Sequence, residues 1–139
     1  MKGDVLLQNI KISGLIPITA GKNAKESKLL IREAILTKLG KNVLNVKKRC
    51  ANKPLSINII FFLHEESHTK KDLDGLSSTI IKILGKDMSS KKDELPGLEI
   101  LTNTNPLHKM IFEKNMIEKD SKEAFSFSIY EWDWIRVKT

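Results

Sequence analysis

The chain has 139 residues, which fits one folded domain (residues 1–139) with a hydrophobic core. Its 40% apolar and 29% charged residues lie in the range of globular proteins, and the formal net charge is +7. One cysteine excludes an intrachain disulfide, and we expect a cytoplasmic protein with no secretory signal, no segment that crosses a bilayer and no membrane partner.

The positive charge is concentrated in residues 20–53. This stretch holds ten basic side chains against Glu26 and Glu33, a local excess larger than the net charge of the whole chain. Concentrated positive charge indicates a polyanionic partner, nucleic acid before an anionic membrane. The alternative is a lysine-rich face that is simply solvated.

The first half of the chain predicts a strand, a helix and a second strand. Residues 5–13 are apolar and β-branched, and the helix starts after Asn23 and ends at Gly40. Residues 42–54 are interpreted as a basic connector. Residues 55–63 predict a central strand, because the second half of this run is apolar on both faces.

The second half predicts a helix and two further strands. Apolar residues at helical spacing indicate a helix over 73–84, with Asp72 as its N-cap and Gly85 after its end. A long polar segment over 86–106 contains one short element at 98–101. Residues 107–117 form a strand, and 125–130 alternate as a strand with one buried face. The order β-α-β-α-β-β predicts an α+β fold with a single mixed sheet and two helices.

Two motifs are weaker candidates for chemistry. Residues 64–68 match the zinc-protease pattern His-Glu-x-x-His, which needs both imidazoles on one helix face. This stretch directly follows a strand, so we interpret it as a polar loop. Cys50 lies among Lys48, Arg49 and Lys53, which favour a lowered thiol pKa, but the sequence shows no base to make it a nucleophile.

Asp72 and Asp74 are the stronger candidates. Two nearby carboxylates repel unless they share a cation, and carboxylate oxygens are the ligands that Mg²⁺ takes. An equally simple alternative is that both acids only stabilise the start of the helix. A metal would need a further oxygen ligand, for which the candidates are Asp87, Asp93, Glu94, Asn103 and Asn105.

The strand over 57–63, the pair Lys70-Lys71, the run Asp72-Leu73-Asp74-Gly75-Leu76 and the Ile-rich helix together resemble the RusA-type Holliday junction resolvases. In that family, basic residues precede an Asp-x-Asp-Asn-Leu motif that opens a helix. This chain has Gly75 in place of the Asn. It has Ser78 where the family has a lysine, so the nearest lysine in the helix is Lys82.

The resemblance implies a homodimeric endonuclease that uses Mg²⁺, or Mn²⁺ as a substitute, to nick four-way DNA junctions. It implies Asp72, Asp74 and Asp93 as catalytic metal ligands and Lys71 as a further catalytic residue. The third acid of the family lies just before the next strand, which by topology is the region of Asn103 and Asn105, and Asp93 takes that place if the segment folds back. DNA would contact basic side chains in three places: Lys22, Lys25, Lys28, then Lys47, Lys48, Arg49, then Lys70 and Lys82.

Two other classes stay open. One is a nucleic-acid-binding domain on the same scaffold with little or no activity. The other is a basic adaptor for a protein or membrane surface, which is disfavoured because the sequence shows no strongly amphipathic basic helix outside the core elements.

Overall fold

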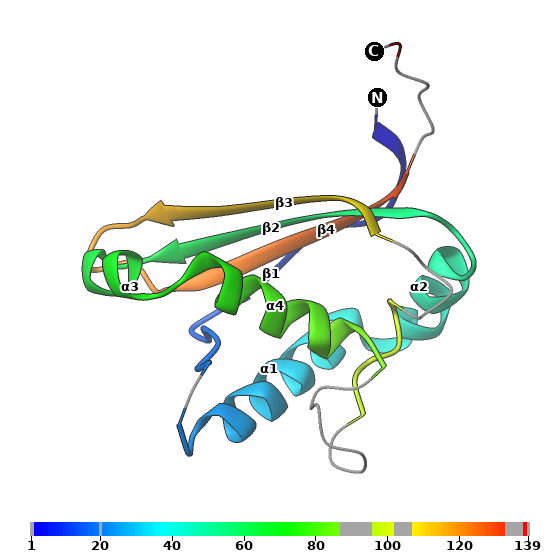
Figure 1. The fold of residues 1–139 in the computed structure, drawn as a ribbon. Coiled ribbons are helices and arrows are strands. Elements are labelled where there is room, and N and C mark those ends of the chain that lie inside the picture. The colour runs from blue at the N-terminus through cyan, green and yellow to red at the C-terminus, as the bar shows by residue number, and fades with distance from the viewer. Residues whose placement is uncertain (1, 20, 87–95, 102–106, 133–137, 139) are drawn as a thin grey trace.

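The structure, a computed structural model, describes residues 2–19, 21–86, 96–101, 107–132 and 138. Its centre is a four-stranded mixed sheet in the order β1-β4-β2-β3 (Figure 1). The strands are β1 (Lys2–Ser13), β2 (Leu55–Leu63), β3 (Leu107–Met116) and β4 (Ala124–Trp132). β4 is antiparallel to β1 and β2, and β2 is parallel to β3. The predicted α+β fold with one mixed sheet is confirmed.

The two long helices are close to those predicted, and they lie on one face of the sheet. They are α1 (Ala24–Leu39) and α4 (Leu73–Leu84), and Gly40 ends α1 with a positive φ of 56°. Asn23 stands at the N-cap of α1, but its side chain makes no capping hydrogen bond. A third helix, α2 (Val43–Cys50), covers the same face of the sheet (Figure 1).

The prediction that residues 42–54 form a connector is wrong. A 3₁₀ turn, η1 (Gly40–Asn42), leads directly into α2, whose Val46 and Cys50 are buried while Lys48 and Arg49 are exposed. A basic amphipathic helix therefore exists outside the two predicted helices. Val46 and Cys50 of this helix belong to the core cluster. A helix of only eight residues gains its stability mainly from such tertiary contacts.

The prediction that β2 is covered on both faces is also wrong. Ile57, Ile59 and Phe61 face the helices and are fully buried, whereas the alternate residues Ile60 and Phe62 are only half-buried. No described helix covers that second face (Figure 1). There the ammonium of Lys11 lies 5.2 Å from the centre of the Phe62 ring, so a lysine from the edge strand shields part of the apolar surface.

The one-sided pattern predicted for β4 is only partly right. Phe125, Phe127 and Ile129 are buried, but Ser128 and Tyr130 of the alternate set are buried as well. β4 is an inner strand, and the edge strand β1 is irregular where it passes Ser128. Asn9, with a φ of 48°, donates its backbone N–H to the Ser128 hydroxyl at 2.9 Å. This bond satisfies the buried hydroxyl.

The short element predicted at 98–101 is neither a helix nor a strand, yet it belongs to the core. Leu98, Ile100 and Leu101 are buried, and their backbone N–H groups donate to the carbonyls of Ile83 and Leu84 at the end of α4. A Cβ at position 97 would overlap the backbone of residue 85. A glycine there allows this close approach.

Candidate functional site

The site begins where β2 ends. The predicted polar loop over 64–68 is wrong, because residues 65–70 form the short helix α3 (Glu65–Lys70). His64 is extended and stands at its N-cap, and Glu65 and Glu66 occupy the first turn, where negative charge is favourable. The Thr69 hydroxyl donates to the Glu65 carbonyl at 3.1 Å. Six residues suffice here because β2 and a second helix hold both ends of the segment.

The two histidines of the His-Glu-x-x-His pattern point to different partners. His64 Nε2 lies 2.6 Å from the Ser121 carbonyl oxygen, and His68 Nε2 lies 3.4 Å from the Lys114 carbonyl oxygen. Within the described residues, no three His, Cys, Asp or Glu side chains are grouped to hold a metal ion. The pattern therefore does not form a zinc site.

Asp72 and Asp74 open α4. Asp72 has an extended backbone and is the N-cap, and its Oδ1 accepts a long hydrogen bond of 3.4 Å from the Asp74 backbone N–H. Both side chains are exposed, and Asp74 lies in the first turn. The capping role predicted from the sequence is present. It engages one carboxylate oxygen of Asp72 and leaves the others facing solvent.

The neighbouring lysines differ in their contacts. The exposed Lys70 ammonium bonds the Glu66 carboxylate at 2.9 Å, one helical turn back, and this hydrogen bond lowers the pKa of Glu66. The half-buried Lys71 ammonium lies 3.5 Å from the Pro17 carbonyl oxygen. Lys71 therefore links the start of α4 to the loop that follows β1.

A lysine that the sequence does not single out supports the α3 linker, the segment over residues 64–71 that joins β2 to α4. Lys114, on the edge strand β3, donates from Nζ to the carbonyls of His68 and Lys71, both at 2.8 Å. These are carbonyls at the C-terminal end of α3, where a cation is favourable. The ammonium thus fixes the backbone immediately before Asp72. Only the pairing of β3 with β2 brings it there, so no local pattern would have found it.

The loop after β1 reaches the same place. β1 and β2 both end at one edge of the sheet, because Ser13 pairs with Ala124 and Ala124 pairs with Phe62. From there the loop places Thr19 against α4: a Cβ on Gly75 would lie 3.6 Å from Thr19 Cγ2. The backbone N–H of Ile18 donates to Ser27 Oγ at 3.0 Å, which ties this loop to α1.

The basic side chains are divided between two ends of the molecule. Lys22, Lys25 and Lys28 lie at the start of α1, which follows the loop that contacts Gly75 and Lys71. Lys47, Lys48 and Arg49 lie on α2, which precedes β2, whereas α3 follows it (Figure 1). The eight residue steps of β2 place these ends about 26 Å apart. Lys82 is in the last turn of α4, about 12 Å along the helix from Asp74.

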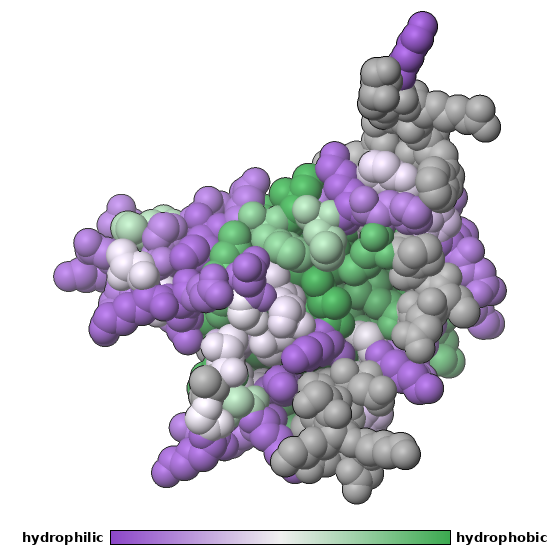
Figure 2. Space-filling view, viewed as in Figure 1, coloured by the Kyte–Doolittle hydropathy of each residue, from purple (hydrophilic) through white to green (hydrophobic). Residues whose placement is uncertain are grey.

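The end that carries α3 and the start of α4 is hydrophilic, whereas apolar surface is exposed between α4 and β3 (Figure 2). Met110 on β3 is 52% exposed, and Ile81 on α4 and Phe112 on β3 are partly buried against the core. The candidate carboxylates therefore face water beside charged side chains and do not lie in an apolar pocket.

The candidates predicted for a further metal ligand lie outside the described residues. Asp87, Asp93, Glu94, Asn103 and Asn105 all fall in the parts of the chain that are not described. The described residues 96–101 are held at the C-terminal end of α4 by backbone hydrogen bonds, and Arg32 Nε donates to the Pro96 carbonyl at 3.1 Å. Asp72 lies at the opposite end of that helix.

The lowered thiol pKa predicted for Cys50 from its basic neighbours is wrong. Burial raises the pKa of its thiol to about 11, which outweighs the opposite effect of Arg49 and Lys53. The side chain is fully buried in the core cluster. A thiol in this environment is neutral and shielded. Cys50 is a core residue and no candidate nucleophile.

Ser77 is a second feature that the sequence does not reveal. Its side chain is 1% exposed and lies on the inner face of α4. Its hydroxyl is the one buried side-chain polar atom, among the described residues, that has no hydrogen-bond partner. A buried hydroxyl without a partner costs free energy. It lies one turn after Asp74, in the same helix.

Comparisons with protein-family models, curated proteins and solved structures found no match to this chain. The chemistry of the site therefore rests on its own residues. Mg²⁺ in proteins keeps several waters and is held by one or two carboxylates together with substrate phosphates. Two exposed carboxylates beside a lysine fit that description, so Asp72 and Asp74 are a suitable donor set for such an ion.

Proposed function

We propose that this protein is a magnesium-dependent endonuclease that acts on branched DNA, as the RusA-type junction resolvases do. The observation that carries the proposal is the pair of exposed carboxylates, Asp72 and Asp74, in the first turn of α4 beside Lys70 and Lys71. Acids that served only as helix caps would not need this flanking positive charge.

Each residue has a role in the proposal. Asp72 and Asp74 hold the ion, which when bound polarises a phosphodiester and lowers the pKa of a water molecule. Lys71 is restrained by its contact with the Pro17 carbonyl, and in the proposal its ammonium contacts a phosphate of the scissile strand. Lys70 is exposed and paired weakly with Glu66, so it exchanges that partner for a phosphate at little cost.

Basic side chains outside the linker bind the DNA backbone in the proposal. Lys22, Lys25 and Lys28 lie at the same end as the carboxylates and contact the strands next to the junction. Lys47, Lys48 and Arg49 lie about 26 Å away and contact an arm of the substrate. Lys82, in the last turn of α4, contacts the DNA backbone as well.

The second candidate is a domain that binds branched nucleic acid without cutting it. The specific observation in its favour is that the described residues contain no group of three metal-binding side chains. Asp93, the third acid of the proposed set, lies outside those residues. Loss of a ligand weakens metal binding and cleavage but leaves phosphate contacts in place.

The test compares cleavage with binding. A labelled four-way junction and a linear duplex of the same sequence are incubated with the protein in Mg²⁺, in Mn²⁺ and in EDTA. We expect metal-dependent nicks in the junction that are lost in Asp72→Asn and in Asp74→Asn. Asparagine is as good an N-cap as aspartate, so Asp72→Asn removes the negative charge and keeps the helix cap. Asp120→Asn, an exposed acid in the turn before β4, is the matched control.

Three outcomes separate the candidates. Tight binding without nicks in either metal would favour the binding domain. Nicks that survive both substitutions would assign the activity to other residues or to a contaminant. Affinity that barely changes with salt would contradict both candidates. In a plot of the logarithm of the binding constant against the logarithm of the salt concentration, each phosphate contact with a duplex contributes a slope of about −0.9.

The proposal includes a homodimer and a cytoplasmic location. Two copies would supply two sites for the two strands that a junction resolvase nicks, and the buried reduced Cys50 suits a reducing compartment. No helix among the described residues is long and apolar enough to span a membrane. Light scattering over a range of concentrations measures the oligomeric state, and a monomer bound to the junction would contradict the dimer.

A further inference from the structure

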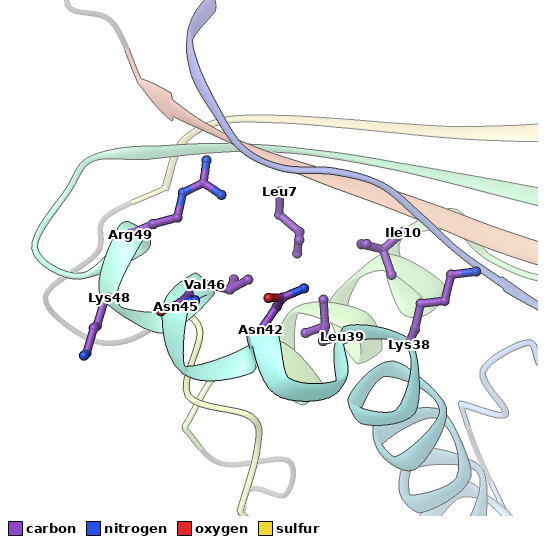
Figure 3. A pocket seen from close by; sticks show the side chains of 9 residues that line it. All are labelled: Leu7, Ile10, Lys38, Leu39, Asn42, Asn45, Val46, Lys48 and Arg49. Atoms are coloured by element: carbon purple, nitrogen blue, oxygen red, sulfur yellow. The ribbon is translucent and has the colours of Figure 1, made fainter.

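A cavity of about 530 Å³ lies beneath β1, where α1 passes through η1 into α2 (Figure 3). Its apolar surface comes from Leu7 and Ile10 on β1 and from Leu39 and Val46 on the helical side. Leu39 and Val46 are 5% and 3% exposed, so they belong to the fixed core. A cavity of this size is in the range of small-ligand sites. We call it the Asn42 pocket.

Polar and cationic side chains surround that apolar surface. Lys38 and Arg49 extend toward β1 from the two sides of the pocket, and the Asn42 amide lies between them below Leu7 and Ile10 (Figure 3). Arg49 is fixed by a 2.9 Å hydrogen bond from Nη2 to the Val5 carbonyl. None of the nine described residues that line the pocket is acidic.

This arrangement selects the chemical class of the ligand. An apolar wall accepts the flat face of an uncharged ring, and an amide offers one donor and one acceptor to the edge of that ring. Cations on two sides attract negative charge on both flanks of the ring. A nucleotide within a strand has this pattern, because its base is flanked by a phosphate on each side.

We propose that the Asn42 pocket binds one unpaired nucleotide of a nucleic-acid strand, with the base against Leu7 and Ile10 and the flanking phosphates near Lys38 and Arg49. The inference rests on the proposed function, since it assigns a specific role to the basic end of the molecule. It adds selectivity for a strand that is locally unpaired, as at a branch point, since a base inside a duplex cannot enter.

The pocket is separate from the carboxylates. Ile10 pairs with Phe127, and Phe127 pairs with Ile59, which lies four residues before the end of β2. The apolar wall is therefore about 13 Å or more from the edge of the sheet at which the α3 linker begins. Binding in the pocket and hydrolysis at Asp72 can thus be disrupted independently.

The experiment measures affinity for three short DNAs by fluorescence anisotropy, in EDTA so that no cleavage occurs. They are a fully paired duplex, the same duplex with one unpaired nucleotide, and that duplex with an abasic residue at the unpaired position. We expect the unpaired base to raise affinity roughly tenfold over the other two DNAs. Burial of an apolar surface about as large as one aliphatic side chain changes the binding free energy by this amount. With 2-aminopurine as the unpaired base, binding changes its fluorescence.

Matched variants locate the effect. Asn42→Phe fills the pocket from an exposed position in η1 and should abolish the tenfold preference, whereas Lys41→Phe, the adjacent exposed residue that does not line the pocket, should retain it. Lys38→Gln should weaken binding of the unpaired base more than Lys41→Gln does. Circular dichroism of each variant establishes that it is folded.

The outcomes distinguish this inference from the proposed function. Failure to bind these three DNAs by protein that still binds a four-way junction would overturn the pocket assignment alone, and failure to bind the junction as well would overturn both proposals. Equal affinity for all three DNAs, unaffected by Asn42→Phe, would overturn the pocket assignment and leave the endonuclease proposal standing. Binding to phosphatidylserine vesicles that Asn42→Phe removes, with DNA binding unchanged, would assign the pocket to a lipid and overturn the nucleotide.

Discussion

Lys114→Met is the variant that best tests how the candidate site is held. The substitution keeps an unbranched apolar side chain on β3 and removes both hydrogen bonds from Nζ, which at 2.8 Å reach the His68 and Lys71 carbonyls. Hydrogen bonds from a charged donor are worth about 1.5–3 kcal/mol. The carbonyls are at a helix end that water can reach, so we expect the pair together to contribute about 2 kcal/mol.

This loss is measurable by urea unfolding followed by circular dichroism. With a slope of about 2 kcal/mol per molar urea, the midpoint should fall by about 1 M, and the melting temperature by roughly 6 °C. Hydrogen exchange should also accelerate at the Lys71 amide, which donates to the Ser67 carbonyl at 2.9 Å. That local readout separates a loosened linker from a general loss of stability.

The control is Lys109→Met, an exposed lysine on the same strand. Its removal should change the free energy of unfolding by no more than about 0.5 kcal/mol. If Lys114→Met and Lys109→Met lose the same stability, and exchange at Lys71 is unchanged, the ammonium does not support the linker and the reasoning is refuted.

Three further predictions concern the core. Ser77→Ala removes a buried hydroxyl without a partner and improves helix propensity, so the free energy of unfolding should stay equal or rise by up to about 1 kcal/mol; a clear loss would reveal a hidden partner. The Cys50 thiol has a folded pKa near 11 against 9.0 for the free group, so the unfolded chain releases the proton first as pH rises. Stability contributed by the neutral thiol is therefore present below pH 9 and lost between pH 9 and 11 by about 2–3 kcal/mol. Denaturant melts of wild type and Cys50→Ala across that range check it, and parallel pH curves would contradict it. Phe61→Ala should lower the free energy of unfolding by about 3–5 kcal/mol, whereas Phe62→Ala on the uncovered face should lower it by less than about 2 kcal/mol. Equal losses would mean that the second face of the sheet is buried too.

Local patterns determined the framework of this protein. The helix over 73–84 is specified by a capping acid, an apolar stripe at helical spacing and a glycine after its end, and each of these acts within a few residues. The strands over 55–63 and 107–117 follow from β-branched and apolar runs in the same way. The pair Asp72 and Asp74 was also identified from sequence, because both its capping role and its charge depend on adjacent residues.

The tertiary structure alone decided the remainder. The short helices α2 and α3 have weak local signals, and contacts with the sheet make them stable. The burial that raises the pKa of Cys50 comes from elements distant in sequence, and it outweighs the adjacent cations. Lys114 reaches the Lys71 carbonyl across 43 residues, and the Asn42 pocket joins β1 to α2. Such pairings are set by strand order and register, which no short stretch of sequence encodes.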